Sequence, residues 1–118
     1  MSKFIIAGSR NFDDYKLLSN TLYEMVMYDP DAEIVSGGSK GADKMGEKFA
    51  KSYGLMLKIF PADWSKHGKA AGPIRNKQMA EYADCLIAFW DGKSRGTKSM
   101  IDLAKKEGLK VYIIEYEF

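Results

Sequence analysis

Apolar and polar positions along the chain form two kinds of segment that alternate. Short runs such as residues 4–7 and 85–90 are almost entirely apolar. Such runs are typical of strands that are buried on both faces of a parallel sheet. Between them lie longer segments with apolar residues every three or four positions, which predict amphipathic helices. This alternation indicates an α/β domain in which each helix returns the chain to the next parallel strand.

The boundaries follow from where each pattern stops and from glycine and proline. Because crossovers between parallel strands are right-handed, the pattern predicts a Rossmann-like three-layer sandwich with helices on both faces of a mostly parallel sheet. We expect the strand order 3-2-1-4-5. No linker or repeat divides the chain, so residues 1–118 form one predicted domain. The predicted strands are residues 4–7, 33–35, 55–60, 85–90 and 111–114, the predicted helices are residues 13–28, 42–53, 73–82 and 97–107, and residues 61–71 are a predicted loop.

Composition agrees with a soluble globular domain: 46% of the 118 residues are hydrophobic and 29% are charged. The single cysteine, Cys85, cannot form a disulfide within the chain. We expect a cytoplasmic protein, because residues 1–7 do not resemble a signal peptide and no apolar run approaches the length of a membrane span. The net charge of +2 is too small to indicate nucleic acid as a partner. No metal or cofactor is expected.

The loops that follow the first four predicted strands carry most of the unusual residues. Because ligands bind beyond the carboxyl ends of parallel strands, these loops are expected to lie along one edge of the sheet. All of them are rich in glycine, small hydroxyl groups or charge. The four loops are residues 8–10, 36–43, 61–64 and 91–97.

Two of these loops contain glycines and enter a helix. Residues 36–43 include Gly37, Gly38 and Gly41, and glycine lets backbone N–H groups approach an anion at a helix N-terminus. The alternative is ordinary turn chemistry, since the loop is neither a Walker loop nor a G-x-G-x-x-G motif. In residues 91–97, the Thr97 hydroxyl either caps the last helix or binds a ligand oxygen.

Arg75 and Asn76 are predicted in the first turn of the helix 73–82. The positive end of the helix dipole does not favour an arginine, which is easier to explain if it meets a phosphate or carboxylate. The alternative is a salt bridge to Asp63 or Asp91. Trp64 either stacks on a base or packs at the rim of the domain.

Five separated motifs together resemble the YspA-like, cpYpsA-related group of the SLOG superfamily, named for the DprA/Smf and LOG proteins. The resemblance covers the chain from about Lys3 to Val111. It implies a Rossmann-like fold that binds nucleotides or nucleotide-derived signals, in proteins found in bacteria and their phages. The motifs are Gly8-Ser9-Arg10; Ser36-Gly37-Gly38 with Gly41-Ala42-Asp43; Pro61-Ala62-Asp63-Trp64; Ala71-Gly72-Pro73-Ile74-Arg75-Asn76 with Met79; and Ala88-Phe89-Trp90-Asp91-Gly92 with Ser94-Arg95-Gly96-Thr97.

One group of the superfamily, the LOG phosphoribohydrolases, cleaves the N-glycosidic bond of cytokinin nucleotides. The resemblance implies an arginine ahead of a methionine, matched by Arg75 and Met79, and a glutamate in P-G-G-x-G-T-x-x-E. Met100 occupies the glutamate position. That change removes a carboxylate that would stabilise an oxocarbenium-like sugar, so the catalytic activity is not carried over.

The sequence therefore predicts a protein that binds a nucleotide or nucleotide-derived small molecule, of the NAD, ADP-ribose or nucleoside phosphate class, as a sensor or processing protein. The first alternative is an N-glycoside hydrolase with Arg75, Asp43 or Asp91 as candidate catalytic residues. The second is single-stranded nucleic-acid binding, which is disfavoured because acidic and basic residues interleave. Surface tyrosines leave room for a homodimer. The predicted ligand-binding residues are Gly8, Ser9, Arg10, Ser36, Gly37, Gly38, Gly41, Ala42, Asp43, Asp63, Trp64, Arg75, Asn76, Asp91, Gly92, Ser94, Gly96 and Thr97.

Overall fold

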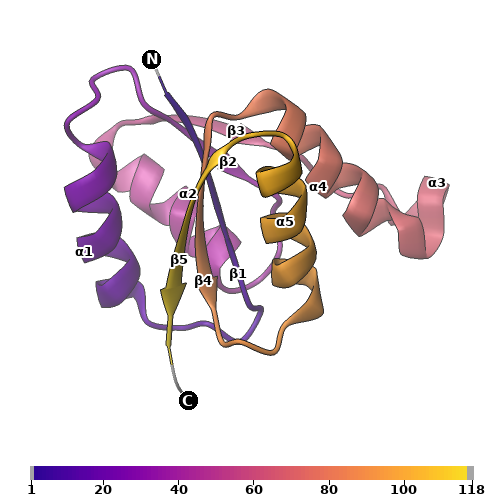
Figure 1. Ribbon diagram of the computed structural model, residues 1–118. Coiled ribbons are helices and arrows are strands. Elements are labelled where there is room, and N and C mark those ends of the chain that lie inside the picture. Colours follow the sequence, from indigo (N-terminus) through magenta and orange to yellow (C-terminus); the bar gives the residue numbers. More distant parts are fainter. Residues whose placement is uncertain (1, 117–118) are drawn as a thin grey trace.

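A parallel β-sheet organises the chain in the computed structural model, which describes residues 2–116 (Figure 1). Within these residues the strands pair in the order β3-β2-β1-β4-β5, and each neighbouring pair is parallel. The predicted strand order is therefore confirmed. The strands are β1 (Lys3–Gly8), β2 (Glu33–Ser36), β3 (Met56–Ile59), β4 (Cys85–Trp90) and β5 (Lys110–Glu115).

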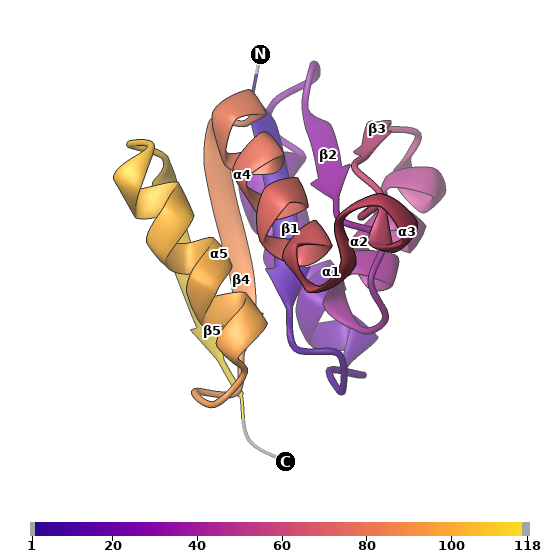
Figure 2. The ribbon, with the colours of Figure 1, turned by 90° about the vertical axis from the view of Figure 1, so that its right-hand side faces the viewer.

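Helices cover both faces of this sheet, as predicted. Helices α1 (Tyr15–Val26) and α2 (Ala42–Tyr53) lie on one face, and α4 (Ala71–Tyr82) and α5 (Arg95–Lys106) lie on the other (Figure 2). A short helix α3 (Trp64–His67) and a 3₁₀ turn, η1 (Gly68–Ala70), lead into α4. The result is the three-layer, Rossmann-like α/β sandwich. Among the described residues, no helix combines the length and the apolar character needed to cross a membrane.

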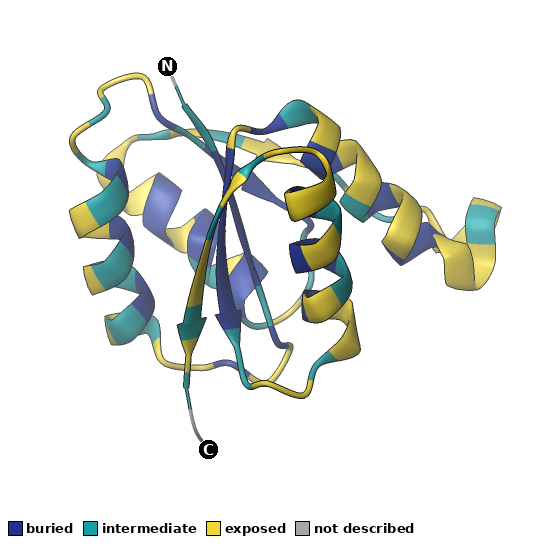
Figure 3. Ribbon diagram, viewed as in Figure 1, coloured by how far each residue is buried: buried dark blue, intermediate teal, exposed yellow. Residues whose placement is uncertain are grey.

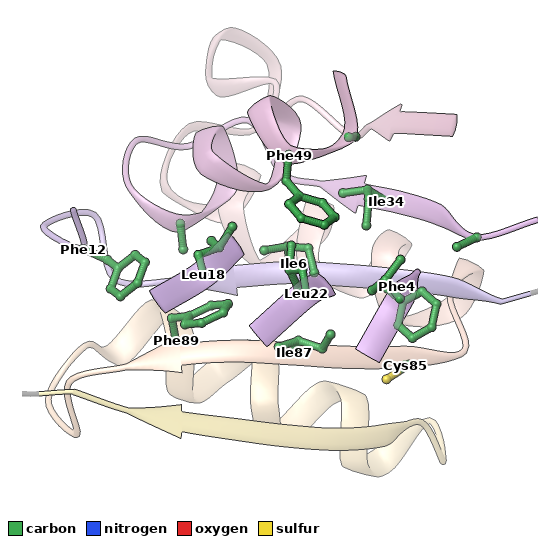
Figure 4. Close-up of a cluster of buried hydrophobic side chains, with 14 residues drawn as sticks. Phe4, Ile6, Phe12, Leu18, Leu22, Ile34, Phe49, Cys85, Ile87 and Phe89 are labelled. Atoms are coloured by element: carbon green, nitrogen blue, oxygen red, sulfur yellow. The ribbon is translucent and has the colours of Figure 1, made fainter. Parts of the chain in front are cut away.

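The core consists of two apolar layers, one on each side of the sheet. Successive residues of a strand point to opposite faces, so Phe4 and Ile6 pack towards α1 and α2 (Figure 4), whereas Ile5 and Ala7 pack towards α4 and α5. The edge strands contribute less, and β5 is mainly exposed or half-buried (Figure 3). The well-buried centre of the sheet therefore holds the carboxyl ends of β1 and β4 in place.

The largest disagreement with the predicted elements falls in residues 61–71, which were predicted to be a loop. They contain α3 and η1, and α4 begins at Ala71 rather than at residue 73. The α3 residues are mostly exposed, so this segment carries no apolar periodicity. Its start is stabilised locally, because Asp63 Oδ1 accepts hydrogen bonds from Lys66 N at 3.1 Å and Ser65 Oγ at 2.7 Å.

Helix α5 begins at Arg95, two residues before its predicted start. Its N-cap is Ser94, whose Oγ accepts a hydrogen bond from Thr97 N at 3.3 Å. The prediction that Thr97 could be the cap was wrong, because a serine one turn earlier takes that position. Helix α1 is also shorter than the predicted 13–28, since Asp14 caps it by accepting a hydrogen bond from Leu17 N at 3.0 Å.

Candidate functional site

The loops at the carboxyl ends of the strands enclose a cavity of about 230 Å³. Its floor is made by the end of β1 and by two buried methionines, Met79 and Met100. Its walls come from the starts of α2 and α5 and from α4. The lining residues are Ala7, Gly8, Arg10, Ser39, Asp43, Arg75, Asn76, Met79, Ser94, Gly96, Thr97 and Met100.

Arg75 is the buried cation of this cavity. It lies in the second turn of α4, because that helix starts earlier than predicted, so the argument from the helix dipole does not apply. Its guanidinium donates from Nη1 to Gly37 O and from Nε to Asn76 Oδ1. Neither acceptor is charged, and no salt bridge to Asp63 or Asp91 forms. Burial lowers the pKa of Arg75, the nearby Asp43 carboxyl opposes that shift, and Arg10 adds to it.

Asp43, in the first turn of α2, is the buried carboxyl that faces this arginine. Its Oδ2 accepts a hydrogen bond from Ser39 N at 3.3 Å, and only 6% of the residue is exposed. Burial raises the pKa of Asp43 to about 7, and Glu47 one turn further on also raises it. The Ser39 amide and Arg75 act in the opposite direction. Asp43 therefore gains or loses its proton near neutral pH, which makes the charge of the cavity depend on pH.

Ser36 and Glu47 complete a buried polar network beneath the cavity. Ser36 Oγ donates to Glu47 Oε2 at 2.7 Å and accepts from Gly38 N at 3.0 Å. Both side chains are buried. This network holds the loop between β2 and α2 from below, so Ser36 supports the site rather than lining it.

Two glycines in that loop are required by close approaches. A Cβ on Gly37 would lie 2.8 Å from Arg75 Nη1 and 2.9 Å from Asp43 Oδ2. Gly41 has φ of 83°, and a Cβ there would lie 2.4 Å from the carbonyl oxygen of Ser9. Any side chain at either position would displace a neighbouring group. The loop thus brings Arg75 and Asp43 together only because it lacks side chains at these points.

The loop between β4 and α5 forms another wall and stabilises itself. Asp91 Oδ1 accepts hydrogen bonds from Lys93 N and Ser94 N, both at 2.8 Å. These bonds hold the pKa of Asp91 below its usual value. Ser94 Oγ lies 3.1 Å from Thr97 Oγ1, and both residues face the cavity. Asp91 itself does not line it.

A second cavity of about 570 Å³ adjoins the first. The two share Arg10, Ser39 and Arg75, which therefore lie at the boundary between them. The remaining lining residues of the second cavity come from the β2–α2 loop, α2, the end of β3, the β3–α3 loop and α3: Gly37, Gly38, Lys40, Lys44, Ile59, Pro61, Ala62 and Trp64.

The structure brings together most of the predicted ligand-binding residues and separates others from the two cavities. Those that line a cavity are Gly8, Arg10, Gly37, Gly38, Asp43, Trp64, Arg75, Asn76, Ser94, Gly96 and Thr97. Those that line neither are Ser9, Ser36, Gly41, Ala42, Asp63, Asp91 and Gly92. Asp63 is the N-cap of α3, directly before Trp64, and aspartate is a preferred residue at that position.

Sequence reasoning missed several lining residues. Lys40 lies among the glycines of residues 36–43, in the loop before α2, and Lys44 lies in the first turn of α2. Met79 and Met100, named from the sequence only within the family motifs, are buried and also line the cavity. Residues 2–116 hold no group of three or more His, Cys, Asp or Glu side chains arranged to bind a metal ion.

The fold and the site define an open, parallel α/β domain with a cavity at the carboxyl edge of its sheet. Comparison with known proteins identifies its family: the chain belongs to the YspA, cpYpsA-related SLOG family, whose model matches residues 2–67. That match includes the loops after β1, β2 and β3, whereas Arg75 and the β4–α5 loop lie beyond it.

Two individual proteins extend this comparison over the rest of the chain. The Gene 61 protein of Mycobacterium phage D29 is 32% identical over an alignment of 118 positions that covers 94% of this chain and 94% of the phage protein. A crystal structure described as a predicted subunit of a tRNA methyltransferase, from Methanocaldococcus jannaschii, matches with a TM-score of 0.50 and 14% identity. The match covers 96% of this chain and 69% of the archaeal chain, and at this identity it shows the fold alone.

Proposed function

We propose that this protein binds a nucleotide or nucleotide-derived small molecule of the NAD, ADP-ribose or nucleoside phosphate class at the carboxyl edge of its sheet, as a sensor or processing protein. Membership of the SLOG family supports a nucleotide-related role. The observation that carries the proposal is Arg75, a buried guanidinium with only neutral hydrogen-bond acceptors that opens into a cavity.

The charge of this arginine favours an anionic ligand. A guanidinium has five N–H donors, and the hydrogen bonds to Gly37 and Asn76 use two of them. The others remain for a phosphate, which Arg can bind through two parallel hydrogen bonds. Arg10 lines the same cavity and adds a second positive charge. The hydroxyl groups of Ser39, Ser94 and Thr97 offer further contacts to phosphate or ribose oxygens.

The test is saturable binding, measured by thermal shift and calorimetry with AMP, ADP-ribose and NAD. We expect Arg75→Gln to weaken binding roughly tenfold or more, because charge-assisted hydrogen bonds are lost. Lys105→Gln, in the exposed last turn of α5, is the matched control and should bind as the unsubstituted protein does. Circular dichroism must show that both variants fold. The proposal fails if no ligand of such a panel binds.

A second candidate function, N-glycoside hydrolysis, is favoured by Asp43 alone. A carboxyl with a pKa of about 7 in the cavity can hold a proton at neutral pH and donate it to a departing base. Water would add to C1′ of the ribose and lose a proton, while the bond from C1′ to the base nitrogen breaks. Met100 lies in the same cavity and offers no charge to stabilise the sugar.

Chromatography of free adenine released from AMP tests this second function, because adenine accepts a proton as it leaves, whereas the cationic nicotinamide group of NAD leaves as a neutral molecule without one. Release should be abolished in Asp43→Asn and retained in Asp91→Asn, because Asp91 lies outside the cavity and its pKa is lowered. If the unsubstituted protein binds AMP but releases no adenine, the protein binds without turnover.

A further inference from the structure

The second cavity adjoins the cavity on which the proposed function depends, and the two share Arg10, Ser39 and Arg75. We propose that it is a subsite for the second half of a two-part ligand, so that dinucleotides are preferred to mononucleotides. This inference rests on the proposed function, because it assumes that the first half of the ligand occupies the cavity at Arg75.

The sizes of the two cavities support this assignment. Small-molecule sites usually enclose roughly 300–1,000 Å³. The first cavity, at about 230 Å³, is smaller than this. A ligand with two nucleotide units therefore cannot fit there entirely, and its second unit must lie past Arg10 and Arg75, where the second cavity of about 570 Å³ begins. That space can hold a further nucleoside unit.

The walls of the second cavity have the chemistry that such a unit needs. The second cavity is lined by Trp64, the first residue of α3, which is 52% exposed. The ring atom Cη2 of Trp64 would lie 3.5 Å from a Cβ placed on Gly72, so the indole rests against the start of α4. An exposed indole held in this way is a surface on which a base or another planar ring can stack. Ile59 and Pro61 extend the apolar wall.

Other lining residues of the second cavity are cationic. Lys40, in the loop before α2, is exposed, and Lys44 Nζ in the first turn of α2 lies 3.6 Å from Glu47 Oε1 with most of its side chain exposed. With Arg10 and Arg75 shared by the two cavities, cationic side chains line both of them. A ligand with phosphates between two ring systems fits this arrangement: the phosphates lie against the cations and one ring lies against Trp64.

Calorimetry with AMP and NAD tests the inference, since both contain an adenylate and only NAD has a second nucleotide. We expect NAD to bind at least tenfold more tightly than AMP. Trp64→Ala should weaken NAD binding roughly fivefold or more, in the range for the loss of one base–aromatic stack, and should change AMP binding by less than twofold. Lys66→Ala, on α3 but outside both cavities, is the matched control.

Fluorescence supplies a readout that a merely structural role of Trp64 would not produce. Trp64 and Trp90 are the two tryptophans of the chain, so Trp90→Phe leaves Trp64 as the reporter. NAD should quench this emission, and AMP should leave it nearly unchanged. Circular dichroism checks that the loss of the hydrogen bond from Trp90 Nε1 to Ser94 O leaves the fold intact.

The outcomes separate this inference from the proposed function. If neither AMP nor NAD binds, both are rejected. If AMP binds and NAD binds no more tightly, or if Trp64→Ala weakens both equally, only the second subsite is rejected. If affinity instead keeps rising from a dinucleotide to a ten-nucleotide oligonucleotide and falls steeply with salt, the second cavity belongs to a nucleic-acid-binding surface and the inference is overturned.

Discussion

The β2–α2 loop and the β4–α5 loop look alike in the sequence but differ in how their aspartates are held. In both, an aspartate accepts hydrogen bonds from loop amides near the start of a helix. Asp91 has two such bonds and little burial, and its pKa is lowered. Asp43 has one longer bond, is buried beside Glu47, and has a pKa raised to about 7.

This difference shows that aspartates which both accept hydrogen bonds from loop amides can have pKa values shifted in opposite directions. The β4–α5 loop satisfies its own amides with Asp91 and caps its helix with Ser94, so it is a stable wall. The β2–α2 loop enters its helix at Gly41 without a side-chain cap and places a titrating carboxyl near Arg75. The second arrangement is the one suited to respond to an anionic ligand.

The largest difference between the two loops is expected when one glycine of each is replaced by alanine. Gly41 and Gly92 have similar φ values of 83° and 80°, but a Cβ at Gly41 meets Ser9 O at 2.4 Å whereas one at Gly92 meets nothing within 4 Å. We expect Gly41→Ala to lower the free energy of unfolding by about 3 kcal/mol or more, and Gly92→Ala by about 1 kcal/mol. Urea denaturation measures both; equal losses would show that backbone strain alone sets the effect.

The next prediction concerns how the two aspartates affect stability as pH changes. The pKa of Asp43 rises from 3.8 in the unfolded chain to about 7 in the folded one, so the folded state holds an extra proton between these values. Its contribution to stability is full below about pH 4 and is lost as pH rises towards 7. Asp43→Asn should therefore stabilise the protein at pH 8, by about 2 kcal/mol, and leave it nearly unchanged at pH 4.

The stability contribution of Asp91 should depend on pH in the opposite direction to that of Asp43. Because its pKa is lowered on folding, its contribution is present above the unfolded pKa of 3.8 and is lost as pH falls through the lower folded value. Asp91→Asn should thus lose stability at pH 7 and not at pH 2. Thermal unfolding from pH 2 to pH 8 compares the two variants, and pH profiles with the same sign would contradict the difference between the loops.

The smallest expected effect is on ligand binding. A bound phosphate near Arg75 disfavours the ionised form of Asp43, so binding should take up part of a proton near pH 7. Affinity for NAD, whose phosphates do not titrate in this range, should fall severalfold between pH 6 and pH 8. The slope should vanish in Asp43→Asn and persist in Asp91→Asn. Calorimetry in buffers of different ionisation enthalpy measures the proton uptake directly.

Much of the fold was predictable because its signals are local. The limits of α2 and β4 match the predicted residues 42–53 and 85–90, since a continuous apolar run marks a buried strand and glycine marks a helix end. The start of α4 was not predictable in the same way. Exposed residues of α3 and η1 lead into it without apolar periodicity, so its start was predicted two residues too late and Arg75 was placed two residues too near the helix start.

Periodicity was enough to predict the α/β class, and the position of the loops after each strand was enough to predict the edge of the sheet where the candidate site lies, because parallel strands all end at one edge. The expected strand order was also confirmed. Only the tertiary structure decided which loop residues face the cavities and which carboxyl is buried. Asp43 and Asp91 have the same side chain, and their pKa values diverge because one is packed beside Glu47 and Arg75 while the other meets its own loop amides. Burial and distance between segments remote in sequence set that difference, and no local pattern encodes them.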